Sequence, residues 1–259
     1  MKKTIITSLT AISCFTFVTA AHGVAVTDWV VTNGTATITN GSTSSPSFDA
    51  INLSVAANLA APISLNDGEA ISFTGSIGLN SGDFGDIQIR VGLFDGPATV
   101  SSGSGSGFQG YWASLPGSFS QRNRYQDGTA TNPFSSFTGA TDIGNAFGSL
   151  PASAAPSGID LDYVFTLTRS GNLFDLFISY DNTANGGTFS ETGSIVGLSN
   201  VDASSFTFNS AALLFGGTLT ATQANINNAD VAVVVPEPST YALAFGGFVA
   251  VVALLRRRR

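Results

Sequence analysis

The chain has 259 residues, of which 43% are hydrophobic and only 10% are charged. Its one cysteine, Cys14, and its one histidine, His22, lie near the N-terminus, so the remaining chain excludes disulfides, cysteine nucleophiles, Cys/His zinc sites and Ser-His-Asp triads. Residues 24–235 carry four arginines against sixteen carboxylates, a net charge of −12, which excludes the phosphate neutralisation on which nucleic-acid binding depends.

The N-terminus has the features of a secretory signal peptide. A basic start precedes an apolar run over residues 5–18, and the small residues of Val18-Thr19-Ala20 suit signal peptidase. We therefore expect residues 1–20 to be removed and the protein to be exported. Ala11-Ile12-Ser13-Cys14, interpreted as a lipoprotein box, is the alternative.

From residue 21 to 234 the hydrophobic pattern has a period of two, which is typical of strands with one buried face. Tight-turn sequences separate these strands, as at Asn33-Gly34, between residues 29–32 and 35–39, and at Ser170-Gly171-Asn172. No helical period occurs outside the two ends. The sequence thus predicts one all-β domain, an antiparallel β-sandwich. The clearest alternation covers Ile71–Leu79, Ile87–Leu93 and Phe174–Tyr180.

Two of these stretches resemble the jelly roll of concanavalin A-like and laminin-G-like domains. Tyr163–Ile178 resembles the hairpin in which such domains run two neighbouring strands, and Ile87–Asp95 resembles a central strand beside it. The resemblance implies a jelly-roll sandwich, and it makes carbohydrate a candidate ligand.

The region from Ser101 to Asp160 lacks this regular alternation. It begins with a flexible tract of serine and glycine, and it then gathers aromatic rings and arginines. Long loops on rigid sandwiches often carry function, and aromatic rings with arginine forks suit sugars and acidic glycans. In the alternative interpretation, the aromatic residues begin an ordinary strand that caps the core, and the arginines pair with carboxylates. The candidate ligand-binding residues are Tyr111, Trp112, Arg122, Arg124 and Tyr125.

Two further segments carry side-chain oxygens of the kind that calcium binds, and their candidate ligands are Asp83, Asp86, Asp181 and Asn185. The second segment begins like an EF-hand loop, but its position twelve is Thr192 and no helix is predicted beside it. Asp, Asn and Gly also dominate β-turns for conformational reasons, so an ordinary hairpin turn is the alternative. We expect no cofactor, with calcium as the one alternative.

The carboxylates do not form a glycosidase motif. Retaining hydrolysis needs two carboxyl groups about 5–5.5 Å apart, and laminarinase-like members of the resembled fold carry Glu-x-Asp-x-x-Glu. The only glutamates between the two ends are Glu69 and Glu191, and Asp160-Leu161-Asp162 lacks a glutamate partner. We therefore expect no enzymatic activity, and a divergent carbohydrate-active enzyme is the alternative.

The C-terminal segment 235–259 combines two prolines, an uncharged stretch over residues 241–255 and four terminal arginines. Arginines resist transfer through a bilayer, so we expect these four to stop translocation and stay in the cytoplasm. At about 1.5 Å per residue, a helix of this length spans roughly 22 Å, which is short of the hydrocarbon core of about 30 Å. The stretch is therefore predicted to be a marginal transmembrane segment that suits processing. The arginines are Arg256, Arg257, Arg258 and Arg259.

This tail resembles the PEP-CTERM sorting signal of bacteria with an outer membrane. The resemblance implies that Pro236, Glu237 and Pro238 are recognised by an exosortase, a membrane-embedded cysteine transpeptidase, in a host that makes an exopolysaccharide matrix. It also implies contact with the inner membrane, at least transiently. A plain C-terminal anchor after a proline linker is the alternative.

Both ends and the sandwich together predict an exported protein of the cell envelope, cell surface or extracellular matrix. Its partners during export would be signal peptidase and exosortase. We expect its non-catalytic sandwich to bind exopolysaccharide or another surface component. A structural surface protein or adhesin without a defined ligand is the alternative.

Overall fold

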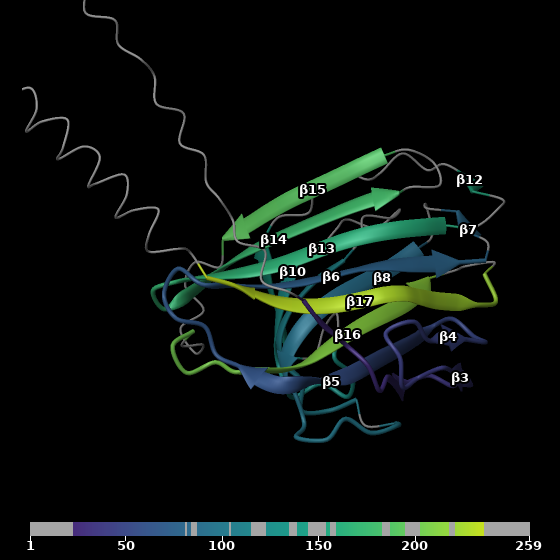
Figure 1. Ribbon diagram of the computed structural model, residues 1–259, viewed down its shortest axis with the longest axis horizontal. Coiled ribbons are helices and arrows are strands. Elements are labelled where there is room, and N and C mark those ends of the chain that lie inside the picture. Colours follow the sequence, from purple (N-terminus) through teal and green to yellow (C-terminus); the bar gives the residue numbers. More distant parts are fainter. Residues whose placement is uncertain are drawn as a thin grey trace, which may run out of the picture. The chain divides into compact units, whose positions relative to one another are not determined.

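The structure is a computed structural model, and it describes residues 23–80, 82–83, 87–103, 105–114, 123–134, 139–144, 154–155, 159–182, 187–194, 203–217 and 221–235. All of these residues belong to one compact unit, Ala21–Val235. Every regular element among them is a β-strand (Figure 1). The same residues include no helix that is long and apolar enough to cross a membrane. The predicted signal peptide and the predicted transmembrane segment lie outside them.

The larger sheet, sheet I, has the spatial order β15-β14-β13-β6-β17-β4-β3, and β1 also pairs with β17. In Figure 1, β15, β14, β13, β6 and β17 follow one another from the top of the view towards its middle. All neighbours in the sheet are antiparallel. The strands are β1 (Val24–Ala25), β3 (Ile38–Thr39), β4 (Ser47–Phe48), β6 (Ala70–Leu79), β13 (Ile159–Ser170), β14 (Leu173–Asn182), β15 (Gly187–Ser194) and β17 (Ala224–Val234).

The second sheet, sheet II, has the order β11-β10-β9-β8-β16-β5-β2 and is also antiparallel. A separate two-stranded ladder joins β7 and β12. The strands of sheet II are β2 (Val30–Asn33), β5 (Leu53–Ile63), β8 (Ile87–Asp95), β9 (Gln109–Ser114), β10 (Asn123–Asp127), β11 (Ala140–Gly144) and β16 (Phe208–Gly217), and the ladder consists of β7 (Gly82–Asp83) and β12 (Ala154–Ala155).

The main hydrophobic core lies between the two sheets. In β13 the alternate residues Leu161, Tyr163 and Phe165 are buried, each with 1% exposure or less, because one face of the strand packs on sheet II. Aromatic rings from both sheets interleave there: Phe174 of β14 lies 5.2 Å from Tyr111 of β9, measured between ring centroids. Burying one such side chain contributes about 1.5–3 kcal/mol. This arrangement confirms the predicted all-β antiparallel sandwich.

The β13–β14 hairpin was predicted correctly. The two strands pair from Ser170↔Leu173 to Leu161↔Asn182. Gly171 lies in the turn between them with φ of 62°, a backbone conformation that glycine adopts without steric cost.

A second, smaller hydrophobic cluster covers the outer face of sheet II. Phe94 of β8 and Trp112 of β9 point away from the main core and pack against Phe108 and Phe134, which lie outside the strands. The ring centroids of Phe94 and Phe108 are 5.8 Å apart, and those of Trp112 and Phe134 are 6.0 Å apart. Both faces of β8 and β9 are therefore buried.

One predicted strand neighbour was wrong. Asn33-Gly34 does separate two strands, but these belong to different sheets, β2 to sheet II and β3 to sheet I. The strand Ile87–Asp95 is β8, which is central as predicted but lies in sheet II, whereas the hairpin has β6 as its neighbour in sheet I. Alternation shows which faces of a strand are buried, but it carries no information about which sheet the strand joins.

The region predicted to be irregular, from Ser101 to Asp160, contains the strands β9, β10 and β11 among its described residues. In β9, Tyr111 and Ala113 are buried in the main core and Trp112 in the smaller cluster, and residues 123–126 of β10 are all buried. The alternation of polar and apolar residues that marks a strand with one solvent-exposed face is consequently absent from much of this segment.

Candidate functional site

The four described members of the predicted ligand-binding set lie on two opposite faces of β9 and β10. Tyr111 and Tyr125 are paired across these strands and contribute to the main core, with ring centroids 5.2 Å apart. Trp112 and Arg124 are also paired, on the outer face of sheet II. Arg122 lies outside the described residues. The strands thus separate this set into two pairs rather than joining it in one site.

On the outer face of sheet II, Trp112 lies near two arginines. The guanidinium carbon of Arg90 is 4.7 Å from the centre of the indole ring, and that of Arg124 is 5.8 Å from it. Both distances are within the range of a cation–π interaction, which stabilises by about 0.5–2 kcal/mol. The indole N–H has no hydrogen-bond partner among the described residues.

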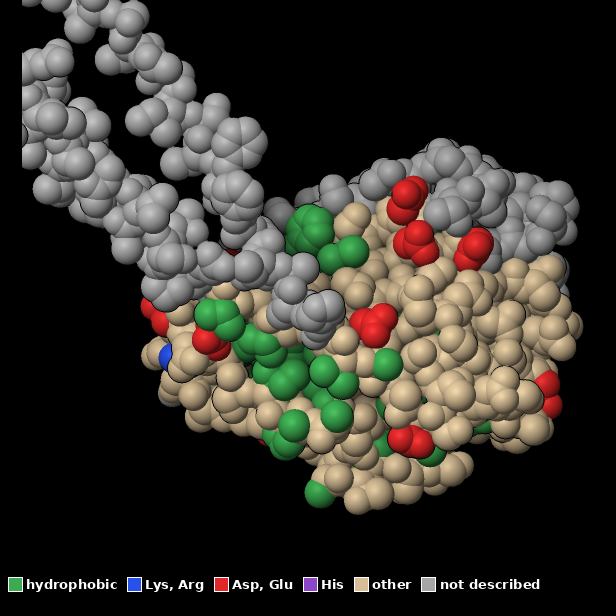
Figure 2. Space-filling model, in the orientation of Figure 1, with side chains coloured by type: hydrophobic (Ala, Val, Ile, Leu, Met, Phe, Trp, Pro, Cys, Tyr) green, Lys and Arg blue, Asp and Glu red, His purple; other side chains and the backbone are tan. Residues whose placement is uncertain are grey.

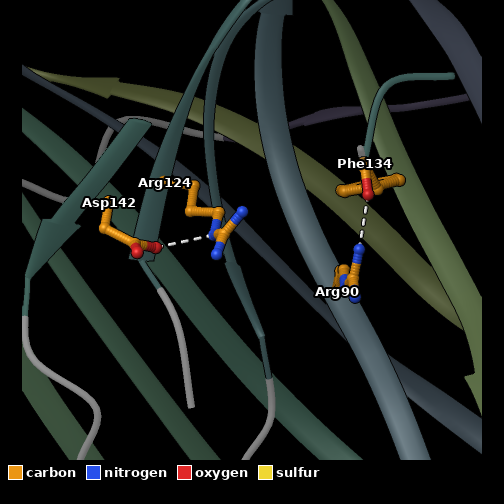
Figure 3. A network of polar contacts seen from close by, with 4 residues as sticks. All are labelled: Arg90, Arg124, Phe134 and Asp142. Carbon is orange, nitrogen blue, oxygen red and sulfur yellow. Dashed lines mark hydrogen bonds and ion pairs between the residues drawn. The ribbon is translucent and has the colours of Figure 1, made fainter. Parts of the chain in front are cut away.

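Each arginine is also held by an oxygen (Figure 3). Arg90 donates a hydrogen bond from Nη1 to the carbonyl oxygen of Phe134. Arg124 Nε lies 2.7 Å from Oδ1 of Asp142, which is opposite it in β11. The side chain of Arg124 is 5% exposed, whereas that of Asp142 is 63% exposed.

The aromatic rings of this set are covered by the protein itself. Trp112 is 0% exposed, Tyr111 1% and Tyr125 5%, and burial raises the pKa of both tyrosines. A sugar stacks on a ring only where one face of the ring is open to solvent. These rings could bind a ligand only if the residues that cover them moved. The geometry matches the alternative interpretation, in which the rings belong to an ordinary strand that packs on the core and Arg124 pairs with a carboxylate.

The predicted calcium ligands are only partly described. Asp83 lies in β7 opposite Ala154 of β12, and Asp181 lies in β14 opposite Asp162. Asp86 and Asn185 lie outside the described residues. Within the described part of the chain, no group of three or more His, Cys, Asp or Glu side chains could hold a metal ion. Calcium binding stays a prediction.

A groove of about 260 Å³ lies between β1, β5 and β17 and is lined by Val24–Val26, Leu59–Ala61, Ile63 and Val231–Val233. Figure 2 shows hydrophobic side chains gathered in the left half of the view. Every side chain that lines the groove is aliphatic, so none of them can donate a hydrogen bond to a polar ligand or accept one. The groove does not suit a sugar.

The outer face of sheet I offers a different kind of surface, which consists of the outward side chains of β14, β13, β6 and β17. It carries short hydroxyl side chains and carboxylates in rows across the strands. One such row runs from Phe177 through Thr166 to Ser72, and the Oγ atoms of the last two are 3.0 Å apart. The outward residues of this face include Asp162, Val164, Thr166, Asp175, Phe177, Ser179, Asp181, Ser72, Thr74 and Asp230.

Two apolar side chains interrupt these polar rows. Val164 of β13 is 38% exposed, and Phe177 of β14 is half-buried. Phe177 pairs with Thr166, so Val164 is its diagonal neighbour, at a distance of about 7–8 Å. Such a surface can contact both the C–H groups and the hydroxyl groups of a ligand, through the apolar pair and through the polar side chains around it.

The charges of this face are all of one sign. Across the described outward positions of β14, β13, β6 and β17 there is no lysine or arginine. Arg169 of β13 has the inward parity, and its guanidinium donates to the carbonyl oxygens of Gly171 and Leu65 at 2.9 and 2.6 Å. Figure 2 shows acidic side chains scattered over a largely uncharged surface, with a basic side chain only at the left margin.

Sequence reasoning missed Val164 and Phe177, although a signal for both exists. Each one lies on the same face of its strand as the polar residues. Val164 follows the buried Tyr163, and Phe177 follows the buried Leu176, so both point to the opposite, outward face. Once it is known which alternate residues of a strand are buried, an apolar residue between them is expected to lie on the outward face. The sequence alone did not separate these residues from the core.

Comparison with known proteins identifies the C-terminal tail. Residues 234–259 match the family model of the PEP-CTERM protein-sorting motif. This match confirms the predicted PEP-CTERM sorting motif, while the predicted transmembrane segment within it stays a prediction, and the motif implies an exported protein that an exosortase sorts to the cell surface. It covers the last residues only, and Pro236–Pro238 and Arg256–Arg259 lie outside the described residues. No curated protein sequence matches this chain.

The structure is similar to solved structures of legume lectins. Lectin II from Ulex europaeus has 13% identity and a TM-score of 0.46, over 84% of this chain and 100% of the lectin. The seed lectin of Lotus tetragonolobus has 12% identity and a TM-score of 0.46, with the same coverage of both chains.

Proposed function

We propose that this protein is a non-catalytic polysaccharide-binding protein of the cell surface or the extracellular matrix, delivered there by its PEP-CTERM motif. The sandwich binds the host's exopolysaccharide through the outer face of sheet I. The observation that supports this face is the apolar pair Val164 and Phe177 among hydroxyl and carboxylate side chains. Such a surface supplies a stacking platform and hydrogen-bonding groups without any movement of the backbone.

The proposal includes no catalysis. Glu69 accepts hydrogen bonds from the amide N and Nδ2 of Asn66, at 2.7 and 3.0 Å, which hold the pKa of Glu69 below its usual value. A carboxyl group that stays ionised cannot act as a general acid at neutral pH. Asp162 and Asp181 occupy opposite positions in the ladder, but both lie exposed on an open sheet face. Closure of an active site around its substrate strengthens the electrostatic interactions inside it, and an open face does not supply this contribution.

A structural surface protein without a defined ligand is the second candidate. Its support is the burial of Tyr111, Trp112 and Tyr125, which uses the aromatic residues of the long region for packing. The two candidates differ in one measurable property, which is saturable binding to a polysaccharide.

The test is binding of the exported protein, purified in detergent, to polysaccharide extracted from its own host. The proposal expects saturable binding that Phe177→Ala weakens at least about tenfold, a change of 1.4 kcal/mol. Val24→Ala is the control, because Val24 is an exposed apolar residue, 56% accessible, outside this face. Absence of saturable binding would support the structural candidate.

Sorting has its own test. Deleting residues 236–259 removes the tail but leaves the described sandwich, and the proposal expects the shortened protein to leave the cell envelope and collect in the culture medium. If it stays in the envelope, the sandwich holds the protein there without its sorting motif.

A further inference from the structure

The aliphatic groove between β1, β5 and β17 is an opening at one edge of the sandwich. β1 and β17 belong to sheet I and β5 belongs to sheet II, so the groove lies between the two sheets. Leu59, Ile63 and Val233 line the groove, and all three also pack against the main core. The hydrophobic core is therefore continuous with the protein surface at this edge.

The surface around the groove is also apolar. Val24 is 56% exposed and Val235 is 50% exposed, and these are two of the three large hydrophobic side chains that are exposed among the described residues. Ala60 and Ala61 of β5 are exposed as well. An exposed apolar surface of this kind marks a contact with another molecule or with a membrane. No charged residue occurs in the three segments that line the groove, which are residues 24–26, 59–63 and 231–233.

The groove lies at the edge of the sandwich where the sorting tail is attached. β17 ends at Val234, and the PEP-CTERM motif matches from that same residue onward. β1 pairs with this end of β17 through Val24↔Val231. The first and the last strand of the described unit thus lie side by side along the groove. The predicted signal peptide and the predicted transmembrane segment are consequently both attached at this edge.

Chain length limits the distance between this edge and a bilayer that holds the tail. Six Cα–Cα steps join Val235 to Tyr241, where the predicted transmembrane segment begins, and they span at most about 21 Å when fully extended. A tail inserted in the membrane therefore keeps Val235 and the neighbouring groove close to the lipid. The boundary between lipid headgroups and acyl chains accepts apolar side chains to a depth of about 5–10 Å.

We infer that this edge of the sandwich docks on a phospholipid bilayer, with the side chains around the groove inserted among the lipids. The inference rests on delivery by the PEP-CTERM motif in the proposed function, and it adds a membrane contact separate from the polysaccharide-binding face. Burial of apolar surface drives the docking, because residues 24–235 have a net charge of −12 and anionic lipids would repel them. Docking keeps the start of the sorting motif near the membrane, where an exosortase acts.

The test measures whether the groove enters the lipid. The full chain is exported by a host without exosortase, so that the tail is retained, and is reconstituted in phosphatidylcholine vesicles. Cys14→Ala makes an introduced cysteine the only one in the chain. An environment-sensitive fluorophore on Ala60→Cys is expected to lose its emission to a nitroxide at a shallow acyl-chain position of the lipid.

The same fluorophore on Gln223→Cys is the matched control for the label. Gln223 is exposed and directly precedes β17, so it lies roughly 30 Å from the groove end of that strand. A label at this position should keep its emission in the same vesicles.

Charge substitutions locate the contact. Val24→Asp and, separately, Ala61→Asp should each lower the docking equilibrium constant at least about tenfold, measured from the quenching at position 60, because a charge resists transfer into lipid. Thr222→Asp is the matched control: Thr222 is exposed at the opposite end of β17, and an aspartate there can still accept the hydrogen bond of Asn80 Nδ2. This control should leave the quenching unchanged. Thermal melting of each variant shows that it is folded.

The outcomes distinguish lipid from other occupants of the groove. A label at position 60 that reports an apolar environment without quenching would mean that protein covers the groove, either a second copy or another segment, and would overturn the inference. Emission typical of water at position 60, or equal quenching at positions 60 and 223, would overturn it as well. Phosphatidylglycerol should weaken the docking at low salt, and stronger docking would contradict an apolar contact.

The inference and the proposed function fail separately. Binding to the host's polysaccharide is measured for the same labelled proteins in detergent. If this binding persists while the label at position 60 stays in water, the inference is overturned and the polysaccharide-binding function remains. If the label is quenched by lipid while no polysaccharide binds, the membrane contact remains and the polysaccharide-binding function is overturned.

Discussion

Trp112 and Arg124 face each other across β9 and β10, with the guanidinium carbon of Arg124 5.8 Å from the centre of the indole ring. Asp142 lies on the other side of Arg124, at 2.7 Å from its Nε. The arginine is buried, but the carboxylate that balances its charge reaches solvent. The stability of this corner of sheet II should therefore depend on Asp142.

Replacing Asp142 with asparagine keeps the shape of the side chain and removes its charge. We expect Asp142→Asn to lower the free energy of unfolding by about 1–2 kcal/mol, because the buried guanidinium loses its nearest countercharge, although solvent screening limits the effect. In a protein of this size, the melting temperature falls by roughly 2–4 °C per kcal/mol. Asp28→Asn, at an exposed aspartate, should change it by less than a degree or so, and equal stability of both variants would contradict the prediction.

Much of sheet I could be predicted from sequence, since its strands bury only one face. In β13, Leu161, Tyr163 and Phe165 alternate with Asp162 and other outward residues, and such alternation is the clearest strand signal. Sheet II was harder to predict at β9 and β10. Tyr111 and Trp112 are neighbours in sequence, both are buried, and they belong to different clusters. A strand that is covered on both sides has no such signal.

The candidate site could not be predicted for a related reason. Exposed aromatic residues look like buried ones in a sequence, so Tyr111 and Trp112 were predicted to bind a ligand although both are buried, and Phe177 was not. Asp162 and Asp181 lie opposite each other because of the register of the β13–β14 hairpin, and the geometry of its two-residue turn sets that register. That register was available only from the structure.

Gly92 makes room for the smaller hydrophobic cluster. A Cβ atom at this position would lie 2.7 Å from ring atoms of Phe94 and 2.8 Å from Cβ of Trp112. Both neighbours are fully buried, so neither can move aside without disturbing its own contacts. We expect Gly92→Ala to lower the free energy of unfolding by about 1–3 kcal/mol, as overpacking does. Urea unfolding would measure it.

Gly78 provides the matched control for this substitution. It lies in β6, and an added Cβ would come no closer than 3.5 Å to another side chain, which is ordinary contact. Gly78→Ala should leave stability unchanged or raise it by about 0.4–1 kcal/mol, because alanine restricts the unfolded chain. If both variants lose the same stability, crowding at Trp112 is not the cause.

The stability of the turn before β6 should depend on pH. Hydrogen bonds from the side chain and then the backbone of Asn66 lower the pKa of Glu69, with a smaller contribution from Arg169. An acid whose pKa is lower in the folded than in the unfolded state stabilises the protein above its unfolded pKa of about 4.3. This contribution is lost as pH falls through the folded value.

Glu69→Gln tests this dependence directly. The variant should be less stable than the wild type at pH 7, because glutamine cannot accept both hydrogen bonds of Asn66. The difference should shrink as the pH falls below about 4, where the wild-type carboxyl becomes protonated. Urea unfolding at a series of pH values measures it, and a difference that stays constant down to the acid range would refute the assignment.

The opposed pair Asp162 and Asp181 yields a prediction of increased stability. Each single substitution, Asp162→Asn or Asp181→Asn, should raise the free energy of unfolding by about 0.2–1 kcal/mol at low salt, because it removes the same repulsion across the ladder. The double variant should then gain little more than either single one, since the repulsion can be removed only once. Added salt should diminish the gain by screening the charges. The measurement is the melting temperature of the wild type, the two single variants and the double variant. If the gains of the single variants add fully in the double variant, the two carboxylates do not interact.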